Sequence, residues 1–148
     1  MAERGVLHHI ELWVPDLARA IDSLGWLLIA LGYTLHQDWP AGRSWRLGDT
    51  YLVVEQSSAL SAAAHDRCQP GLNHLAFHVG DVVQLSELVA DAATHGWTLM
   101  FADRHPYAGG DDHCAGYLEN SDGFEVELVA ASRIGPRMSD PDPAALGN

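Results

Sequence analysis

The side chains best suited to chemistry in this sequence are two histidines and two glutamates that occupy corresponding parts of its two halves. His9 and His74 open short alternating segments, and Glu55 and Glu127 stand in later alternating segments. Imidazole nitrogens and carboxylate oxygens together suit a divalent first-row metal, and four such ligands leave two positions of an octahedral shell open. Adjacent open positions could chelate two neighbouring oxygens of a small molecule and stabilise charge that develops on them.

These residues belong to a pattern that the chain contains twice. The segment 9–16 (HIELWVPD) recurs as 74–81 (HLAFHVGD), with His, an aliphatic residue, Val and Asp at matching positions. Each copy alternates with period two and changes to helical periodicity after its Asp, whose carboxylate can cap the new helix. The pattern therefore predicts helices over 17–31 and 82–95, ended by Gly32 and Gly96.

Three short strands are expected after each helix, because alternating segments separated by turn residues follow it. Their predicted ranges are 33–38, 44–47 and 51–56 in the first half, and 97–103, 114–119 and 125–130 in the second. The predicted fold class is α+β, with two tandem βαβββ modules forming a cupped mixed sheet around a cavity. The expected organisation is one domain over 1–131, comprising module one (about 6–56), a linker (57–71) and module two (about 72–131), followed by a flexible C-terminal tail (132–148).

Alternation also assigns the two faces of each predicted sheet. One phase is apolar and belongs under the helices: Ile10, Leu12, Val14, Leu52 and Val54 in module one, and Leu75, Phe77, Val126 and Leu128 in module two. The other phase is unusually polar and carries all four candidate ligands. Glu11, His78, Tyr117 and Glu125 share that face and could line the same cavity.

Composition narrows the classes of partner. Among 148 residues, 20 acidic side chains stand against 8 basic ones, which gives a formal charge of −12. That field repels phosphate backbones and anionic membrane surfaces, so neither nucleic acid nor a membrane is an expected partner. Only two cysteines are present, and the start has no apolar signal region, which predicts a cytoplasmic, reduced protein that binds a small-molecule substrate.

The two strand openers that end at Asp16 and Asp81, together with a closing stretch, resemble the vicinal oxygen chelate superfamily, which includes glyoxalases, bleomycin resistance proteins and extradiol dioxygenases. The closing stretch 120–128 (NSDGFEVEL) is similar to the family's Asp-Pro-Asp-Gly-x-x-x-Glu-Leu pattern, with Asn120 for the first Asp and Ser121 for the Pro. The resemblance covers about residues 7–130.

The resemblance implies a metal set of His9, Glu55, His74 and Glu127, of which Glu55 rests on strand phase alone. The implied cofactor is a divalent ion among nickel, zinc, iron, cobalt and manganese. Glu127, Glu55 and Tyr117 are the candidate catalytic residues, because a carboxylate at the metal can also move a proton. The implied function is that of a glyoxalase-like enzyme of the lyase or isomerase type, which chelates vicinal oxygens of its substrate.

Two alternatives remain beside this interpretation. An extradiol-type dioxygenase is favoured by Tyr117, three residues before Asn120, whereas Ser121 and the absence of the expected upstream His disfavour it. A metal-free antibiotic-binding protein could use aromatic side chains for stacking, namely Trp13, Trp39, Trp45, Trp97 and Tyr51. We expect a homodimer, with the modules pairing either within one chain or by exchange between two. The loop 104–113 is either a lid or an ordinary connection.

Overall fold

The computed structural model describes residues 2–131, so the predicted tail at 132–148 lies outside the described residues. Module one contains β1 (His9–Trp13), a helix built of α1 (Leu17–Ala20), a π-helical stretch η1 (Ile21–Gly25) and α2 (Trp26–Ala30), then β2 (Thr34–Trp39), β3 (Gly42–Leu47) and β4 (Thr50–Glu55). Module two contains β5 (His74–His78), α3 (Val82–Ala92), β6 (Trp97–Met100), β7 (Ala115–Asn120) and β8 (Glu125–Val129). The predicted βαβββ repeat is confirmed, and most element ends lie within two residues of the predicted ones.

The two aspartates begin the helices as their positions predict. The Asp16 side chain accepts from the backbone N–H of Arg19 at 2.9 Å. Asp81 accepts from the N–H of Gln84, and the Gln84 side chain accepts from the N–H of Asp81, both at 2.9 Å. This reciprocal capping box satisfies N–H groups that the first turn of a helix cannot pair internally. The local sequence therefore determines where each strand ends and its helix begins.

The strands form two four-stranded mixed sheets with the orders β1-β4-β3-β2 and β5-β8-β7-β6. In each sheet the first strand runs parallel to the last, and the remaining pairs are antiparallel. The register opposes His9 to Tyr51 in module one, and His74 to Glu125 in module two. Because both sheets have the same order, the two modules can be compared position by position.

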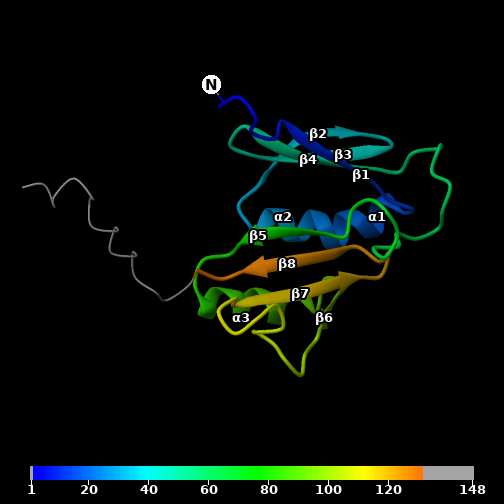
Figure 1. The fold of residues 1–148 in the computed structure, drawn as a ribbon. Helices are drawn as coiled ribbons and strands as arrows, with labels where there is room; N and C mark the ends of the chain where they lie inside the picture. Colours follow the sequence, from blue (N-terminus) through cyan, green and yellow to red (C-terminus); the bar gives the residue numbers. More distant parts are fainter. Residues whose placement is uncertain (1, 132–148) are drawn as a thin grey trace, which may run out of the picture.

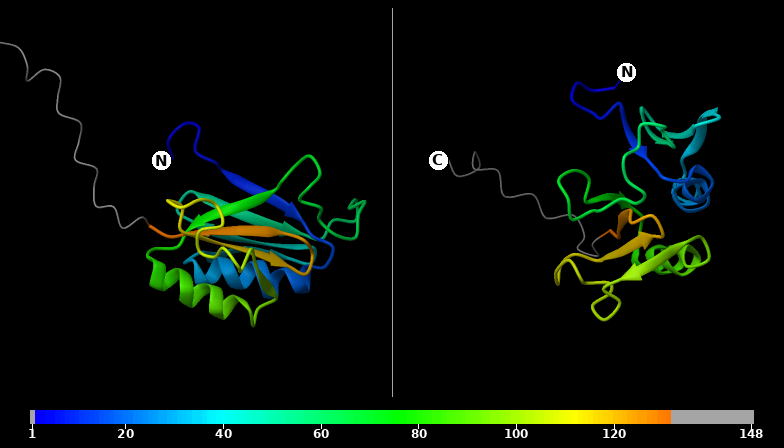
Figure 2. Two further views of the ribbon diagram at one scale, coloured as in Figure 1. Left: turned by 60° about the horizontal axis from the view of Figure 1, so that its bottom comes forward. Right: turned by 90° about the vertical axis from the view of Figure 1, so that its right-hand side faces the viewer.

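The apolar faces of both sheets share one hydrophobic core with the helices. Buried residues of this core come from each sheet and each helix: Leu12, Val54, Leu24, Leu27, Leu28, Leu85, Trp97, Leu118, Val126 and Leu128. In Figure 1, α1 and α2 lie between the strands of module one and β5 of module two, and Figure 2 shows the helices of both modules on one side of the strands. The polar faces that carry the candidate ligands are therefore turned away from the shared core.

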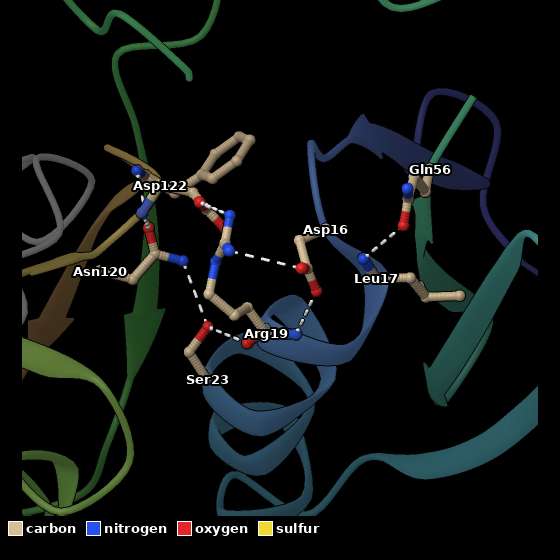
Figure 3. Close-up of polar contacts among 8 residues, drawn as sticks. Asp16, Leu17, Arg19, Ser23, Gln56, Asn120 and Asp122 are labelled. Carbon is tan, nitrogen blue, oxygen red and sulfur yellow. Dashed lines mark hydrogen bonds and ion pairs between the residues drawn. The ribbon is translucent and has the colours of Figure 1, made fainter. Parts of the chain in front are cut away.

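Polar contacts also join the first helix to the turn between β7 and β8 (Figure 3). Arg19 pairs with Asp122 at 2.8 Å, and the Asn120 side chain donates to the Ser23 hydroxyl at 3.2 Å. The Trp97 indole N–H donates to the backbone carbonyl of Ser23 at 3.1 Å. Asn120 and Asp122 are both buried whereas Arg19 is largely exposed, so these contacts fix one module against the other at the edge of the shared core.

The predicted linker at 57–71 is packed against module two. The His65 ring stacks on Phe124 with centroids 4.5 Å apart, and the His65 N–H donates to the Asp122 carbonyl at 2.9 Å. The segment therefore has a fixed position beside β8. Within residues 2–131, no helix has the length and apolar character needed to span a bilayer.

Candidate metal and substrate site

The buried carboxylate of Glu127 is the centre of a polar cluster on the outer face of module two. Glu127 projects from β8 and is 7% exposed. His74, on the neighbouring strand β5, places its Nε2 atom 3.0 Å from Glu127 Oε2. These two predicted ligands are therefore brought together, because the parallel register sets Glu127 opposite Ala76, diagonally across from His74.

Two further side chains reach the other oxygen of Glu127. The Tyr117 hydroxyl, on β7, donates to Oε1 at 3.1 Å, and His113 Nε2 also contacts Oε1. His113 lies in the loop between β6 and β7, in which Gly109 lies next to the Tyr117 hydroxyl. The predicted place of Tyr117 beside Glu127 agrees with this geometry, whereas His113 was not among the predicted site residues.

His113 could have been found from the period of its strand. Alternate residues of a strand lie on the same face, and steps of two back from Tyr117 lead through Ala115 to His113. This spacing places the His113 imidazole on the same face as Tyr117.

In this cluster the carboxyl group of Glu127 is deprotonated, whereas the hydroxyl group of Tyr117 is protonated. Burial alone would raise the pKa of Glu127, but hydrogen bonds from His113 and Tyr117, the charge of His113 and the hydrogen bond from His74 together lower it. Burial raises the pKa of Tyr117, and its bond to Glu127 and the nearby carboxylates raise it further. At neutral pH, Glu127 is therefore an anion that can bind a cation, and Tyr117 keeps its proton for donation.

A second buried carboxylate strengthens the negative field at this site. Glu125 lies two residues before Glu127 on the same face of β8 and is 5% exposed. Arg67 Nε, from the segment 57–71, approaches Glu125 Oε2 to 3.3 Å, but that oxygen accepts no hydrogen bond from the described residues. An incompletely paired buried carboxylate beside Glu127 favours a positively charged occupant.

Module one presents a different arrangement on its outer face. His9 stacks on Tyr51, with centroids 4.9 Å apart and planes 7° from parallel. Glu55 lies opposite Trp13, at the far end of the same strand pair, and the position equivalent to Glu127 is occupied by Val53. His9 and Glu55 are thus separated by about 13 Å of strand. Neither residue bonds to His74 or Glu127 within residues 2–131.

Glu55 is instead paired with another carboxyl group, and this pairing predicts a pH-dependent stability. Burial, a hydrogen bond with Glu11 and the charge of Glu11 raise the pKa of Glu55. A carboxyl group with a raised folded-state pKa favours folding at low pH, and this contribution is lost as pH rises through the folded pKa. Glu55→Gln should therefore have a higher Tm than the wild type at pH 7, and the difference should vanish below about pH 4.

Thermal unfolding followed by circular dichroism across this pH range tests the expectation. In a Glu11→Gln background the effect of Glu55→Gln should shrink, because the opposing charge is already absent. A wild-type protein that is the more stable of the two at pH 7 would show that ionised Glu55 is stabilised in the fold.

The side chains around Glu127 carry donor atoms that suit a divalent metal. His74 and Glu127 fit, with His113 as a further nitrogen donor nearby, whereas His9 and Glu55 are too far apart to join them in one chain. As the side chains stand, no group of three or more His, Cys, Asp or Glu residues between 2 and 131 has the geometry of a metal centre. In the cluster, the imidazole nitrogens touch the carboxylate oxygens directly.

A groove of about 800 Å³ lies elsewhere, between the first helix, the β2–β3 hairpin and the end of α3. Its walls include Trp26, Leu35 and Trp45, and none of the predicted ligands lines it. The Glu127 cluster is the better candidate for chemistry, because convergent donors meet a buried anion there.

Comparison with known proteins places the chain among related sequences and folds. A family described as the Glyoxalase/Bleomycin resistance protein/Dioxygenase superfamily matches residues 8–117. An uncharacterized Bacillus subtilis protein, YqjT, is 42% identical over 127 residues, which are 85% of this chain and 99% of that protein.

Solved structures give the same grouping. The crystal structure of a candidate glyoxalase from Bacillus halodurans superposes with a TM-score of 0.82 and 39% identity, covering 86% of this chain and 97% of that one. A lactoylglutathione lyase from Agrobacterium tumefaciens shares the fold, with a TM-score of 0.60 and 16% identity, covering 91% of this chain and 100% of that one.

Proposed function

The chain belongs to the glyoxalase/bleomycin resistance protein/dioxygenase superfamily, and from that premise we propose that it is a metal-dependent, glyoxalase-like enzyme of the lyase or isomerase type. Its substrate is a small molecule with two adjacent oxygens, such as a hydroxyketone or a dicarbonyl compound. The observation that carries the proposal is the buried, anionic Glu127 with His74 directed at it from the next strand.

In this proposal His74 and Glu127 hold the divalent cation, and His113 is near enough to support it. The cation would supply Lewis acidity toward the two substrate oxygens. Glu127 is kept anionic, so its carboxylate can accept a proton from the carbon next to a carbonyl group. Tyr117 keeps its hydroxyl proton and can donate a hydrogen bond to a substrate oxygen on which charge develops.

An extradiol-type dioxygenase is the second candidate. The specific observation in its favour is that two imidazoles and one carboxylate meet in the cluster, which is the donor combination of many non-haem iron oxygenases. Oxygen uptake on addition of a catechol to the iron-loaded protein would favour this candidate. Isomerisation of a hydroxyketone without oxygen uptake would favour the first.

Metal binding by matched histidine variants tests the proposal. His74→Ala should lower the affinity for nickel, cobalt or zinc about 100-fold or more and remove turnover, because it deletes a donor. His78→Ala is the control, since His78 lies on the same face of β5 but, unlike His74, makes no hydrogen bond or ion pair with Glu127 among residues 2–131. Isothermal titration of the metal-free protein measures the affinities, and a screen of dicarbonyl, hydroxyacid and catechol compounds measures turnover.

Equal affinities in the two variants would contradict the proposed site. A wild-type protein that binds no metal, but whose tryptophan fluorescence is quenched by an aromatic antibiotic, would favour the metal-free binding protein.

A further inference from the structure

Asn73 connects the segment 57–71 to the ring of His74. The Asn73 side-chain nitrogen donates to the backbone carbonyl of Arg67 at 3.0 Å. Its oxygen, Oδ1, lies 2.7 Å from His74 Nδ1. Because the amide N–H₂ group is directed at a carbonyl, which can only accept, the oxygen must be the atom that faces the ring.

This orientation determines which ring nitrogen of His74 carries a proton. An amide oxygen can only accept, so Nδ1 must be the donor in that contact. A neutral imidazole has a single N–H group, and with the proton on Nδ1 the other nitrogen, Nε2, presents a lone pair. That lone pair lies 3.0 Å from a carboxylate oxygen of Glu127.

Two lone pairs that face each other at this distance repel. The ring nitrogen and the carboxylate oxygen can therefore attract each other only through a cation that binds both. A proton on Nε2 is one such cation, and a divalent metal ion is the other. The neighbouring Glu125 carboxylate adds negative charge on the same face, which favours the cation of higher charge.

We infer that Asn73 is a positioning residue for the metal: anchored by the Arg67 carbonyl, it holds His74 as the Nδ1–H tautomer and directs the Nε2 lone pair at the cation. The inference rests on the proposed function. It gives the segment 57–71 a role in the site, because that segment supplies the carbonyl that fixes the amide.

Asn73 is exposed, and two substitutions there test whether its oxygen acceptor, and not another part of the side chain, supports metal binding. Asn73→Ala removes the oxygen that receives the Nδ1 proton, so nickel affinity should fall about 10- to 100-fold. Asn73→Asp keeps an oxygen acceptor next to Nδ1 but loses the amide donor to the Arg67 carbonyl, so nickel affinity should fall less than in Asn73→Ala, because a carboxylate raises the basicity of the ligating nitrogen. Gln69→Ala, in the same segment, serves as the control, because the Gln69 side chain bonds only to Asp66 among residues 2–131.

Affinities are measured by isothermal titration of nickel into the metal-free proteins, with melting curves to check folding. Nitrogen-15 spectra of the zinc-loaded wild type should show His74 protonated at Nδ1. Unchanged affinity in Asn73→Ala, equally weak binding by Asn73→Asp and Asn73→Ala, or a His74 bound through Nδ1 would each overturn the inference.

The failure of the proposed function is distinguishable from these outcomes. A wild-type protein that binds neither nickel nor zinc, or that binds them equally well after His74→Ala, overturns the proposed site and this inference together. Loss of binding in His74→Ala with no loss in Asn73→Ala overturns the inference alone.

Discussion

We expect the Glu127→Gln protein to fold as the wild type does and to lose at least about 100-fold in affinity for divalent cations, together with all measurable turnover. The amide keeps the shape of the side chain but removes the negative charge, and it offers one acceptor oxygen where the carboxylate has two. Isothermal titration with nickel and zinc measures the loss. Melting of the metal-free proteins shows whether folding is preserved.

Glu125→Gln is the matched control for this prediction. Glu125 lies on the same strand and the same face and is equally buried, but its nearest charged partner is Arg67. We expect its metal affinity to fall less than that of Glu127→Gln, by less than about tenfold, because the substitution removes nearby negative charge but leaves both proposed ligands in place. If the two variants lose affinity equally, the general negative field of the strand, and not ligation by Glu127, holds the cation.

The fold could be predicted closely because its signals are local and occur twice. A strand, a capping Asp, a helix and a closing glycine each follow from neighbouring residues, and repetition of the pattern 65 residues later supports each assignment. The π-helical stretch at Ile21–Gly25 was not predicted, since it depends on packing: a Cβ atom at Gly25 would lie 2.8 Å from the Trp45 ring.

The site could be predicted only in part, because strand phase assigns a face but not a register. Glu55 and Glu127 have the same phase, yet the pairing of β1 with β4 sets Glu55 two residue pairs beyond the position that Glu127 occupies in β8. Strand phase also does not predict which polar sheet faces contact each other. Here the apolar faces share a core, so the polar faces of the two modules point outward. Pairing of those faces would need a second copy of the chain, so the homodimer with exchanged modules stays a prediction.

Gly123 should be the most sensitive glycine in the described part of the chain, since a positive φ and overlap with the backbone of another segment combine there. Its φ of 86° is unfavourable for any residue with a Cβ atom, and a Cβ atom would overlap the backbone carbonyl oxygen of His65. Gly48 provides the matched control, because its φ of 61° is also positive but no atom lies within 4 Å of a built Cβ.

Gly48→Ala should cost about 1 to 2 kcal/mol of unfolding free energy from backbone conformation alone. Gly123→Ala should cost about 3 kcal/mol or more, because it adds displacement of the segment 57–71 and loss of the bond from the His65 N–H to Asp122. Urea denaturation, analysed with one m-value for both proteins, compares the free energies of unfolding of the two variants. Since the same segment anchors Asn73, Gly123→Ala should also weaken nickel binding, whereas Gly48→Ala should not. Equal losses of stability in both variants would mean that the segment is not held against Gly123 in solution.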